Sequence, residues 1–320
     1  MKLRYAFALM LLMAVAPAQA QEWPTGTVKI VVPFGPGSTP DTVARVIADQ
    51  LKQEHAGVTF VVENKPGASG NLGTDVVAKA TPDGTTIGIS IGGPLAINTL
   101  LFSKLPYDPK TDIAPITQLI SLPSVLAVSP ELKVNTIGEL ITLLKANPGK
   151  YNFSSIGTGS LSQLAVEATA IKAGTKLVHI PYASSPQAIM AVIRNDAQMA
   201  CLPAITVEPQ AQAGKVKILA VSTAKRSRFL PNVPTLKESG IDVEADAWMG
   251  LIAPGHTPKP VIDKINKDVV AILKLPAVRD KLATQMMEPV GSTPEQFRQT
   301  IDNEITRWAP VIKAANIKVN

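Results

Sequence analysis

The chain has 320 residues with 46% hydrophobic and 18% charged side chains, and its net charge is +6. These proportions indicate a globular protein and exclude a disordered or low-complexity chain. Aromatic residues make up only 4%, and none lies within the one dense basic cluster, Lys225–Arg228, so binding to nucleic acid is not favoured. Cys201 is the only cysteine, which excludes an intramolecular disulfide, and its apolar surroundings predict a buried side chain.

The first 20 residues have the pattern of a signal peptide. Lys2 and Arg4 precede an apolar stretch over residues 5–16, and a small-x-small triplet follows at residues 18–20. The apolar stretch is too short to span a bilayer, and no cysteine follows it, so we expect a soluble exported protein and not a lipoprotein. Cleavage after Ala20 would deliver the chain to the periplasm and lower its net charge from +6 to +4, because two basic residues leave. The remaining length predicts two domains.

Short apolar strands alternate with amphipathic helices after the signal peptide. The expected order is a strand over residues 27–34, a helix over 40–54, a strand over 58–67, a helix over 70–80 and a strand over 85–92. Such an alternation predicts a parallel sheet with helices on both faces.

A second series of the same kind begins at residue 124. Strands are expected over residues 124–130, 151–155, 176–182, 197–204 and 216–223, with helices over 136–147, 160–174 and 186–195. Thr136 and Glu139 have the spacing of a capping box, and Gly174 is placed to end a helix. An isolated strand over 248–254 follows, and helices lead to the C-terminus. Two such series predict an α/β protein with two lobes.

Each series contains a turn rich in glycine and hydroxyl residues between a strand and a helix. The first turn is Gly35–Pro40 and the second is Gly157–Ser160. At a helix N-terminus, free backbone N–H groups and the helix dipole attract anions without a basic residue. One turn in each lobe therefore predicts that the two turns face each other across a cleft.

A nucleotide or metal site is not favoured at these turns. Pro40 stands where a dinucleotide fingerprint needs its third glycine, and neither turn contains the lysine of a P-loop. Glu63 lies 28 positions after Gly35, farther than a ribose-binding acid usually does. The sequence has no HExxH motif and no paired cysteines, so we expect neither a metal nor a cofactor.

An exported serine hydrolase is the alternative from a different class of function. Ser160 lies in a strand-to-helix turn, but its surroundings read G-T-G-S-L and not G-x-S-x-G. Ser160, Asp246 and His256 have a chain order that is formally possible for a catalytic triad, although such orders arise easily by chance. We expect a binding protein without catalytic activity.

The chain resembles the Bug, or TctC, family of periplasmic solute receptors of tripartite tricarboxylate transporters. Matching stretches occur in order along almost the whole mature chain. They are "KIVVPFGPG", "VVENKPGASGNLG", "PDGTTI", "LPYDP", "YNFSSIGTGS", "HIPYASSPQA", "KILAVSTAKRSRFLPNVPTLKESG" and "WMGLIAPGHTP".

The resemblance implies a Venus-flytrap receptor whose two α/β lobes are joined by a hinge. Lobe 1 would comprise residues 21–123 and 246–320, and lobe 2 residues 124–245. The implied ligand is a small organic carboxylate, and the implied partners are the membrane permease subunits of a tripartite transporter, with the receptor itself a monomer. A receptor that feeds a two-component sensor kinase is an alternative. The identity of the carboxylate stays open between a dicarboxylate, an aromatic acid, an amino acid and an amide.

The resemblance also implies which residues bind the ligand, by their position in the matching stretches. The first-lobe contacts would be Phe34, Gly35, Ser38, Thr39 and Asp41, and the second-lobe contacts Gly157, Thr158, Gly159 and Ser160. Tyr182 would line the wall, and Pro203, Ala204 and Ile205 would line the far end. The chain departs from the family at "PFGPGSTPD", where "PFPAGG" is usual, and at "PYASS", where "PYKG" is usual.

Overall fold

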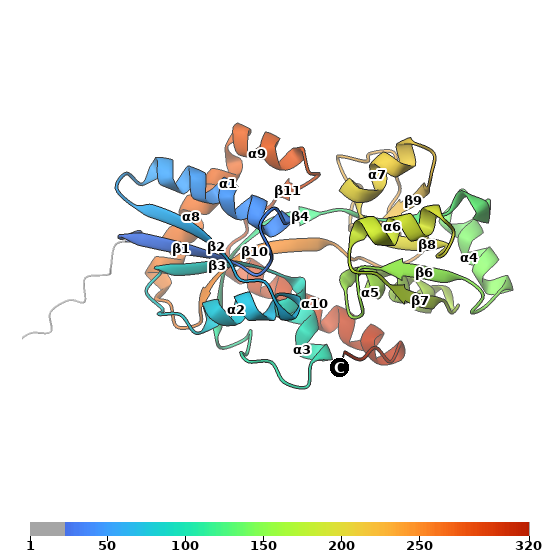
Figure 1. Ribbon diagram of the computed structural model, residues 1–320, viewed down its shortest axis with the longest axis horizontal. Coiled ribbons are helices and arrows are strands. Elements are labelled where there is room, and N and C mark those ends of the chain that lie inside the picture. Colours follow the sequence, from blue (N-terminus) through green and yellow to red (C-terminus); the bar gives the residue numbers. More distant parts are fainter. Residues whose placement is uncertain (1–22, 320) are drawn as a thin grey trace, which may run out of the picture.

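The computed structural model describes residues 23–319, which form two α/β lobes side by side (Figure 1). The predicted signal peptide and its cleavage site after Ala20 lie outside the described residues. Among residues 23–319, no helix is both long and apolar enough to cross a membrane.

The first lobe is built on a six-stranded sheet. Its strands are β1 (Thr27–Val32), β2 (Thr59–Asn64), β3 (Thr86–Ile91), β4 (Ile113–Leu122), β10 (Ala247–Pro254) and β11 (Glu288–Pro289), in the order β11-β4-β10-β3-β1-β2. Successive residues of β1 point to opposite faces, because Val28, Ile30 and Val32 enter one hydrophobic core and Val31 enters another. Both faces of this sheet are therefore covered.

Helices pack on both faces of the first sheet. The helices of this lobe are α1 (Thr39–Glu54), α2 (Asn71–Ala78), α3 (Asn98–Leu101), α8 (Lys259–Lys274), α9 (Pro276–Ala283) and α10 (Pro294–Ala314). Short turns η1 (Ala68–Gly70) and η2 (Gly93–Ile97) precede α2 and α3. Helices α1 and α8 pack beside each other, and their apolar residues share the larger of the two cores of this lobe.

The second lobe is built on a five-stranded sheet. Its strands are β5 (Ser124–Val128), β6 (Asn152–Ser155), β7 (Val178–Pro181), β8 (Met199–Pro203) and β9 (Lys217–Val221), in the order β7-β6-β8-β5-β9. Its helices are α4 (Ile137–Ala146), α5 (Leu161–Ala173), α6 (Ser185–Ile193) and α7 (Ala204–Gln212), with the short turn η3 (Pro130–Leu132). Cys201 of β8 is buried in the core that β8 shares with α4 and α5, which confirms the predicted burial of its side chain.

Both sheets are mixed, whereas the sequence pattern predicted parallel sheets. Strand β10 pairs antiparallel with β3 and β4, and β5 pairs antiparallel with β8 and β9. The reason is the path of the chain. It leaves the first sheet along β4, builds the second lobe, and returns as β10, which inserts between β3 and β4. The isolated strand predicted over residues 248–254 is this returning strand.

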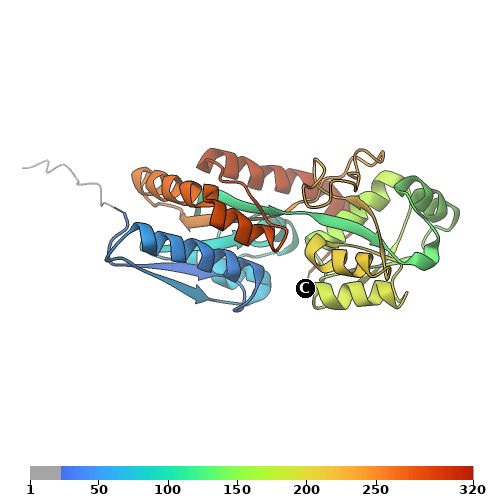
Figure 2. The ribbon, with the colours of Figure 1, turned by 90° about the horizontal axis from the view of Figure 1, so that it is seen from above.

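Three segments connect the lobes. The chain passes from the first sheet to the second through Pro123, between β4 and β5, and returns between β9 and β10. The third connection is α10, which extends along both lobes (Figure 2). Phe297 and Ile301, near its start, enter a core of the first lobe, whereas Trp308 and Ile312, near its end, enter a core of the second.

The local signals that bound the predicted helices are present in the structure. Thr136 Oγ1 accepts a hydrogen bond of 3.1 Å from the Glu139 N–H at the start of α4. The Glu139 carboxylate accepts from the N–H of Asn135, one residue before the cap. Gly174 has a φ of +66° and ends α5, and Pro40 lies in the first turn of α1.

Candidate ligand-binding site

A cavity of about 370 Å³ lies where the two lobes meet. Its walls come from the C-terminal ends of β1, β3 and β6, from η2 and α3, and from the N-terminal turn of α5. The return segment (residues 222–246, between β9 and β10), the start of β10 and α10 also contribute to them. The lining residues are Phe34, Ser69, Ile91, Gly92, Gly93, Ile97, Asn98, Leu101, Phe102, Ile156, Gly157, Thr158, Gly159, Ser160, Leu161, Asp246, Ala247, Trp248, Met249, Glu304 and Val319.

The second-lobe turn opens onto this cavity as one continuous segment. Residues 156–161, at the end of β6 and the start of α5, all line the cavity. The backbone N–H groups of Thr158, Leu161 and Ser162 have no acceptor among the described residues. Free N–H groups at the N-terminus of a helix of this length favour an anion.

Side chains within the turn hold its backbone in place. Ser160 is the N-cap of α5, because its Oγ accepts from the N–H of Gln163 at 3.4 Å, and it donates to the Gly157 carbonyl at 2.6 Å. The Gln163 side chain in turn accepts from the N–H of Gly159 at 2.8 Å. Gly159 has a φ of +77°, and a Cβ there would lie 2.4 Å from Leu101 Cδ1, so only glycine fits this turn against α3.

The first-lobe turn contains an acidic side chain, Asp41, that binds groups of the protein itself. The Asp41 carboxylate accepts hydrogen bonds from the N–H of Gly37 at 2.9 Å, from Arg45 at 3.0 Å through two nitrogens, and from the Asn64 amide at 3.0 Å. The hydrogen bond from Arg45 is the main reason that the pKa of Asp41 falls to about 2, against the opposing effect of its burial. The Asp41 side chain is thus saturated by partners from this protein.

Phe34 is the one predicted first-lobe contact among the residues that line the cavity. Its carbonyl accepts from the Asn64 amide at 2.9 Å, which fixes the end of the turn, and its ring lies against Gly70. Gly35, Ser38, Thr39 and Asp41 lie farther along the turn and are not among the lining residues. The ligand contacts implied for these four residues stay predictions.

The four outer contacts implied for the second lobe also lie away from this cavity. Tyr182 borders a separate surface depression with Met190 and Arg194. Pro203 and Ala204 are the junction of β8 and α7, where Ala204 is buried in the core beneath α6, and Ile205 is exposed. Their role in binding stays a prediction.

The wall between the lobes contains acidic residues that sequence reasoning did not assign to the ligand site. Asp246 is in the return segment just before β10, and Glu304 comes from α10. Two of the three connections between the lobes, the return segment and α10, meet here, so the lobe crossing predicted at residue 246 is the signal that could have identified Asp246. Among the lining residues that the structure describes, Asp246 and Glu304 are the charged ones, and none is Lys, Arg or His.

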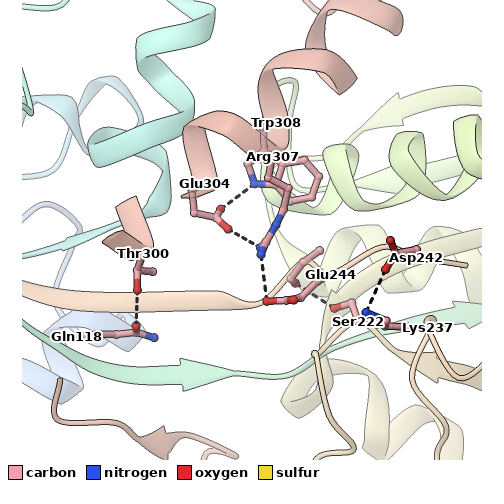
Figure 3. Close-up of polar contacts among 10 residues, drawn as sticks. Gln118, Ser222, Lys237, Asp242, Glu244, Thr300, Glu304, Arg307 and Trp308 are labelled. Atoms are coloured by element: carbon pink, nitrogen blue, oxygen red, sulfur yellow. Dashed lines mark hydrogen bonds and ion pairs between the residues drawn. The ribbon is translucent and has the colours of Figure 1, made fainter. Parts of the chain in front are cut away.

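The two acids differ in their partners. Glu304 is buried, and its two oxygens accept from Arg307 and from the Trp308 indole, each at 2.7 Å. Figure 3 shows Arg307 reaching from α10 to both Glu304 and Glu244 of the return segment. Asp246 Oδ1 is buried and has no hydrogen-bond partner among the described residues. Burial raises the pKa of Asp246 to about 7, with a further rise from Glu244.

The residues of the formal triad do not assemble. Ser160 and Asp246 line the cavity, but His256 does not. His179 contacts Ser155 instead, at 2.6 Å, and that serine is fully buried. Within residues 23–319, no group of three or more His, Cys, Asp or Glu side chains is placed to hold a metal ion.

Comparison with known proteins gives consistent matches along most of the chain. The family profile described as the tripartite tricarboxylate transporter family receptor matches residues 43–317. Protein BugT of Bordetella pertussis is 33% identical over 308 residues, which cover 95% of this chain and 94% of BugT.

Solved structures of similar proteins share the two-lobe fold. The R. palustris protein Rpa4515 with adipate has a TM-score of 0.79 and 33% identity, and the match covers 93% of this chain and 99% of that chain. MatC from Rhodopseudomonas palustris with bound malate has a TM-score of 0.74 and 29% identity, and the match covers 91% of this chain and 100% of that chain. With a family profile that matches residues 43–317 and a relative that is 33% identical along nearly its full length, the chain belongs to the tripartite tricarboxylate transporter receptor family, the Bug or TctC family of periplasmic solute-binding proteins.

Proposed function

We propose that this protein is a receptor that binds a small organic carboxylate in the cavity between its lobes. The observation that carries the proposal is that the N–H groups of Thr158 and Leu161, at the start of α5, have no acceptor among the described residues. Both residues line a cavity whose described lining has no basic residue. The ligand carboxylate would be held by these N–H groups and by the dipole of α5. Adipate in Rpa4515 and malate in MatC, two proteins similar to this one, support a carboxylate as the class of ligand.

The receptor would work in the periplasm and deliver its ligand to the permease subunits of a tripartite tricarboxylate transporter. Membership of the receptor family supports this partner. The charge order and cleavage site of residues 1–20 support export with cleavage after Ala20. The predicted lobe boundaries, at Pro123 and near Ala245, are part of this proposal, with hinges in the connecting segments.

Ligand-linked stability tests the proposed function. A carboxylate that binds the folded protein and is present at about 100 times its dissociation constant should stabilise it by about 2.7 kcal/mol. Thermal unfolding with a library of small carboxylates should therefore identify at least one compound that raises the melting temperature. A library without effect contradicts the proposal.

Two further measurements separate this receptor from the alternatives. Turnover of a generic ester, lost in Ser160→Ala, would identify a hydrolase, and we expect no turnover. Small-angle scattering should give a smaller radius of gyration with the stabilising carboxylate, because the ligand joins surfaces of both lobes. An unchanged radius at saturation contradicts closure of the lobes.

A further inference from the structure

The wall of the cavity between the lobes contains two buried polar atoms that lack partners. They are Oδ1 of Asp246 and Nε1 of Trp248, and neither has a hydrogen-bond partner among the described residues. Trp248 is only 5% exposed, and both residues line the cavity. Buried polar atoms are nearly always hydrogen-bonded in folded proteins, so two unpartnered atoms at one cavity indicate a group that completes them.

The Trp248 indole lies in the wall of the cavity, beside Gly92. Its ring packs against Phe297 in an edge-to-face arrangement, with ring centroids 5.4 Å apart. A Cβ at Gly92 would lie 3.4 Å from the indole ring and 3.6 Å from Nε1, and Gly92 itself lines the cavity. The indole N–H is therefore a donor for a ligand oxygen, whereas the Asp246 carboxylate is an acceptor for a ligand donor.

The arginines around Asp246 are each paired with another carboxylate. Arg307 is held by Glu304 at 2.7 Å and by Glu244 at 3.1 Å. On its other side, Asp246 borders a second cavity in which Arg228 is paired with Glu288, while Arg226 is paired with Glu238. The titratable groups that face Asp246 from these elements are Glu244, Glu304, Arg307, Cys201, Lys225, Arg226, Arg228 and Glu288.

We propose that the ligand has an ammonium group, or a comparable nitrogen donor, in addition to its carboxylate, and that Asp246 binds this nitrogen. The proposal rests on the proposed function, in which the N-terminus of α5 binds the carboxylate. A second carboxylate near Asp246 would meet two acidic residues and no basic residue among the described lining. An ammonium instead meets an unpaired acceptor, and a charge-assisted hydrogen bond forms. The cavity is thus selective for a small amino carboxylate over a dicarboxylate.

Matched pairs of probes test this selectivity by calorimetric titration. Each pair has the same number of methylene groups and differs only in one end group: succinate with 3-aminopropanoate, glutarate with 4-aminobutanoate, and adipate with 5-aminopentanoate. At pH 8 we expect at least one amino member to bind the wild-type protein about tenfold or more tighter than its dicarboxylate partner, as one hydrogen bond to a charged group predicts. This comparison needs no variant. A dicarboxylate that binds tighter than the amino member in every pair overturns the proposal.

Asp246→Asn keeps the shape of the side chain and removes its charge. We expect this variant to lose about tenfold or more in affinity for the amino member, with no loss for the dicarboxylate. Asp242→Asn is the matched control, because it makes the same change four residues earlier, where the side chain is 76% exposed, and it should change neither affinity. Equal losses for both probe classes in Asp246→Asn overturn the assignment of Asp246.

The pH dependence distinguishes the two ways in which Asp246 could meet a ligand. Because the pKa of Asp246 is raised to about 7, its carboxylate gains charge between pH 6 and pH 8. Affinity for the amino member should rise over this range. Affinity for a dicarboxylate should fall over the same range, because ionised Asp246 repels a second carboxylate. If affinity for the amino member stays constant or falls instead, Asp246 does not bind its nitrogen, and the proposal is wrong. If both probe classes and the carboxylate library fail to bind, the receptor function itself is contradicted together with this inference.

Discussion

Asp41 illustrates how one residue can stabilise a turn that the sequence marks as a ligand site. Its carboxylate accepts from Gly37, Arg45 and Asn64, so it joins the turn before α1 to the end of β2. An internal carboxylate at this position interacts with the same helix N-terminus that an external anion would use. The binding role implied for this turn and the structural role of Asp41 thus concern the same backbone groups.

The first prediction concerns Asp41→Asn. The variant should unfold about 1 to 3 kcal/mol more easily at pH 7, because a buried charged acceptor is replaced by an amide that also presents donors to Arg45. The pKa of Asp41 is lowered to about 2, so its stabilising effect is present above about pH 4 and is lost as the pH falls through about 2. Urea unfolding across this range measures it. Asp49→Asn, on the exposed side of the same helix, is the control and should change little.

Asp246 has the opposite dependence on pH. Its pKa is raised from 3.8 to about 7, so the ligand-free protein is less stable when this carboxyl is ionised. Asp246→Asn should therefore match the wild-type stability near pH 4 and exceed it by about 1 to 4 kcal/mol at pH 8. Thermal unfolding at the two pH values measures the difference. Equal stability at pH 8 would mean that the carboxylate has a partner in solution.

At the scale of single elements, the N-terminal turn of α5 combines two properties in one serine. Ser160 caps the helix and also lines the cavity. Ser184 caps α6 through a contact of the same kind, with its Oγ 3.4 Å from the N–H of Gln187, but it does not line the cavity. A comparison of Ser160 with Ser184 therefore separates the effect of a lost helix cap from an effect on ligand binding.

The prediction for this turn compares Ser160→Ala with Ser184→Ala. Both variants should lose about 0.5 to 2 kcal/mol of stability, because each helix loses its cap. Only Ser160→Ala should weaken binding of the stabilising carboxylate, since its hydroxyl also holds Gly157 in place at 2.6 Å. Melting temperatures and calorimetric titration measure the two effects. Equal affinities of the two variants would place the carboxylate away from α5.

The elements that the sequence predicts are those with a local signal. The turn at residues 157–160 was predicted because strand, glycines and helix follow one another, and the structure places all four residues at the cavity. Strand β4 was not predicted, because Pro115 interrupts its apolar pattern. This strand lies inside the sheet only because β10 and β11 pair with it on its two sides. Helix α7 was also missed, and its interior proline, Pro209, explains the weak signal.

The acidic wall of the cavity could not be derived from local pattern. Asp246 and Glu304 are 58 positions apart and meet only because α10 returns along the second lobe. No periodicity or motif encodes such a meeting. The mixed sheets were not predicted for the same reason. The direction in which β10 enters the first sheet depends on where the chain leaves the second lobe.

At the scale of the whole molecule, α10 belongs to both lobes. Its first half packs against β4 and its second half against α5, so a movement of the lobes must be accommodated along this helix. Arg307 joins α10 to the return segment through Glu244 and also neutralises the buried Glu304 (Figure 3). The two ion pairs of Arg307 differ in burial, since the Glu244 side chain is 43% exposed and that of Glu304 is 4% exposed.

The last prediction uses this difference in burial to compare how much each ion pair of Arg307 contributes to the free energy of unfolding. Glu244→Gln should cost at most about 1 kcal/mol, because an exposed ion pair in water contributes little. Arg307→Gln should cost about 3 kcal/mol or more, because it leaves the Glu304 carboxylate buried with only the Trp308 indole as a partner. Burial already raises the pKa of Glu304 above its usual value, and loss of Arg307 should raise it further. The deficit of Arg307→Gln should therefore shrink as the pH falls and Glu304 binds a proton. Chemical denaturation of both variants at pH 5 and pH 8 tests this. Equal costs at pH 8 would mean that the exposed pair with Glu244, and not the pair with buried Glu304, accounts for the contribution of Arg307 to stability.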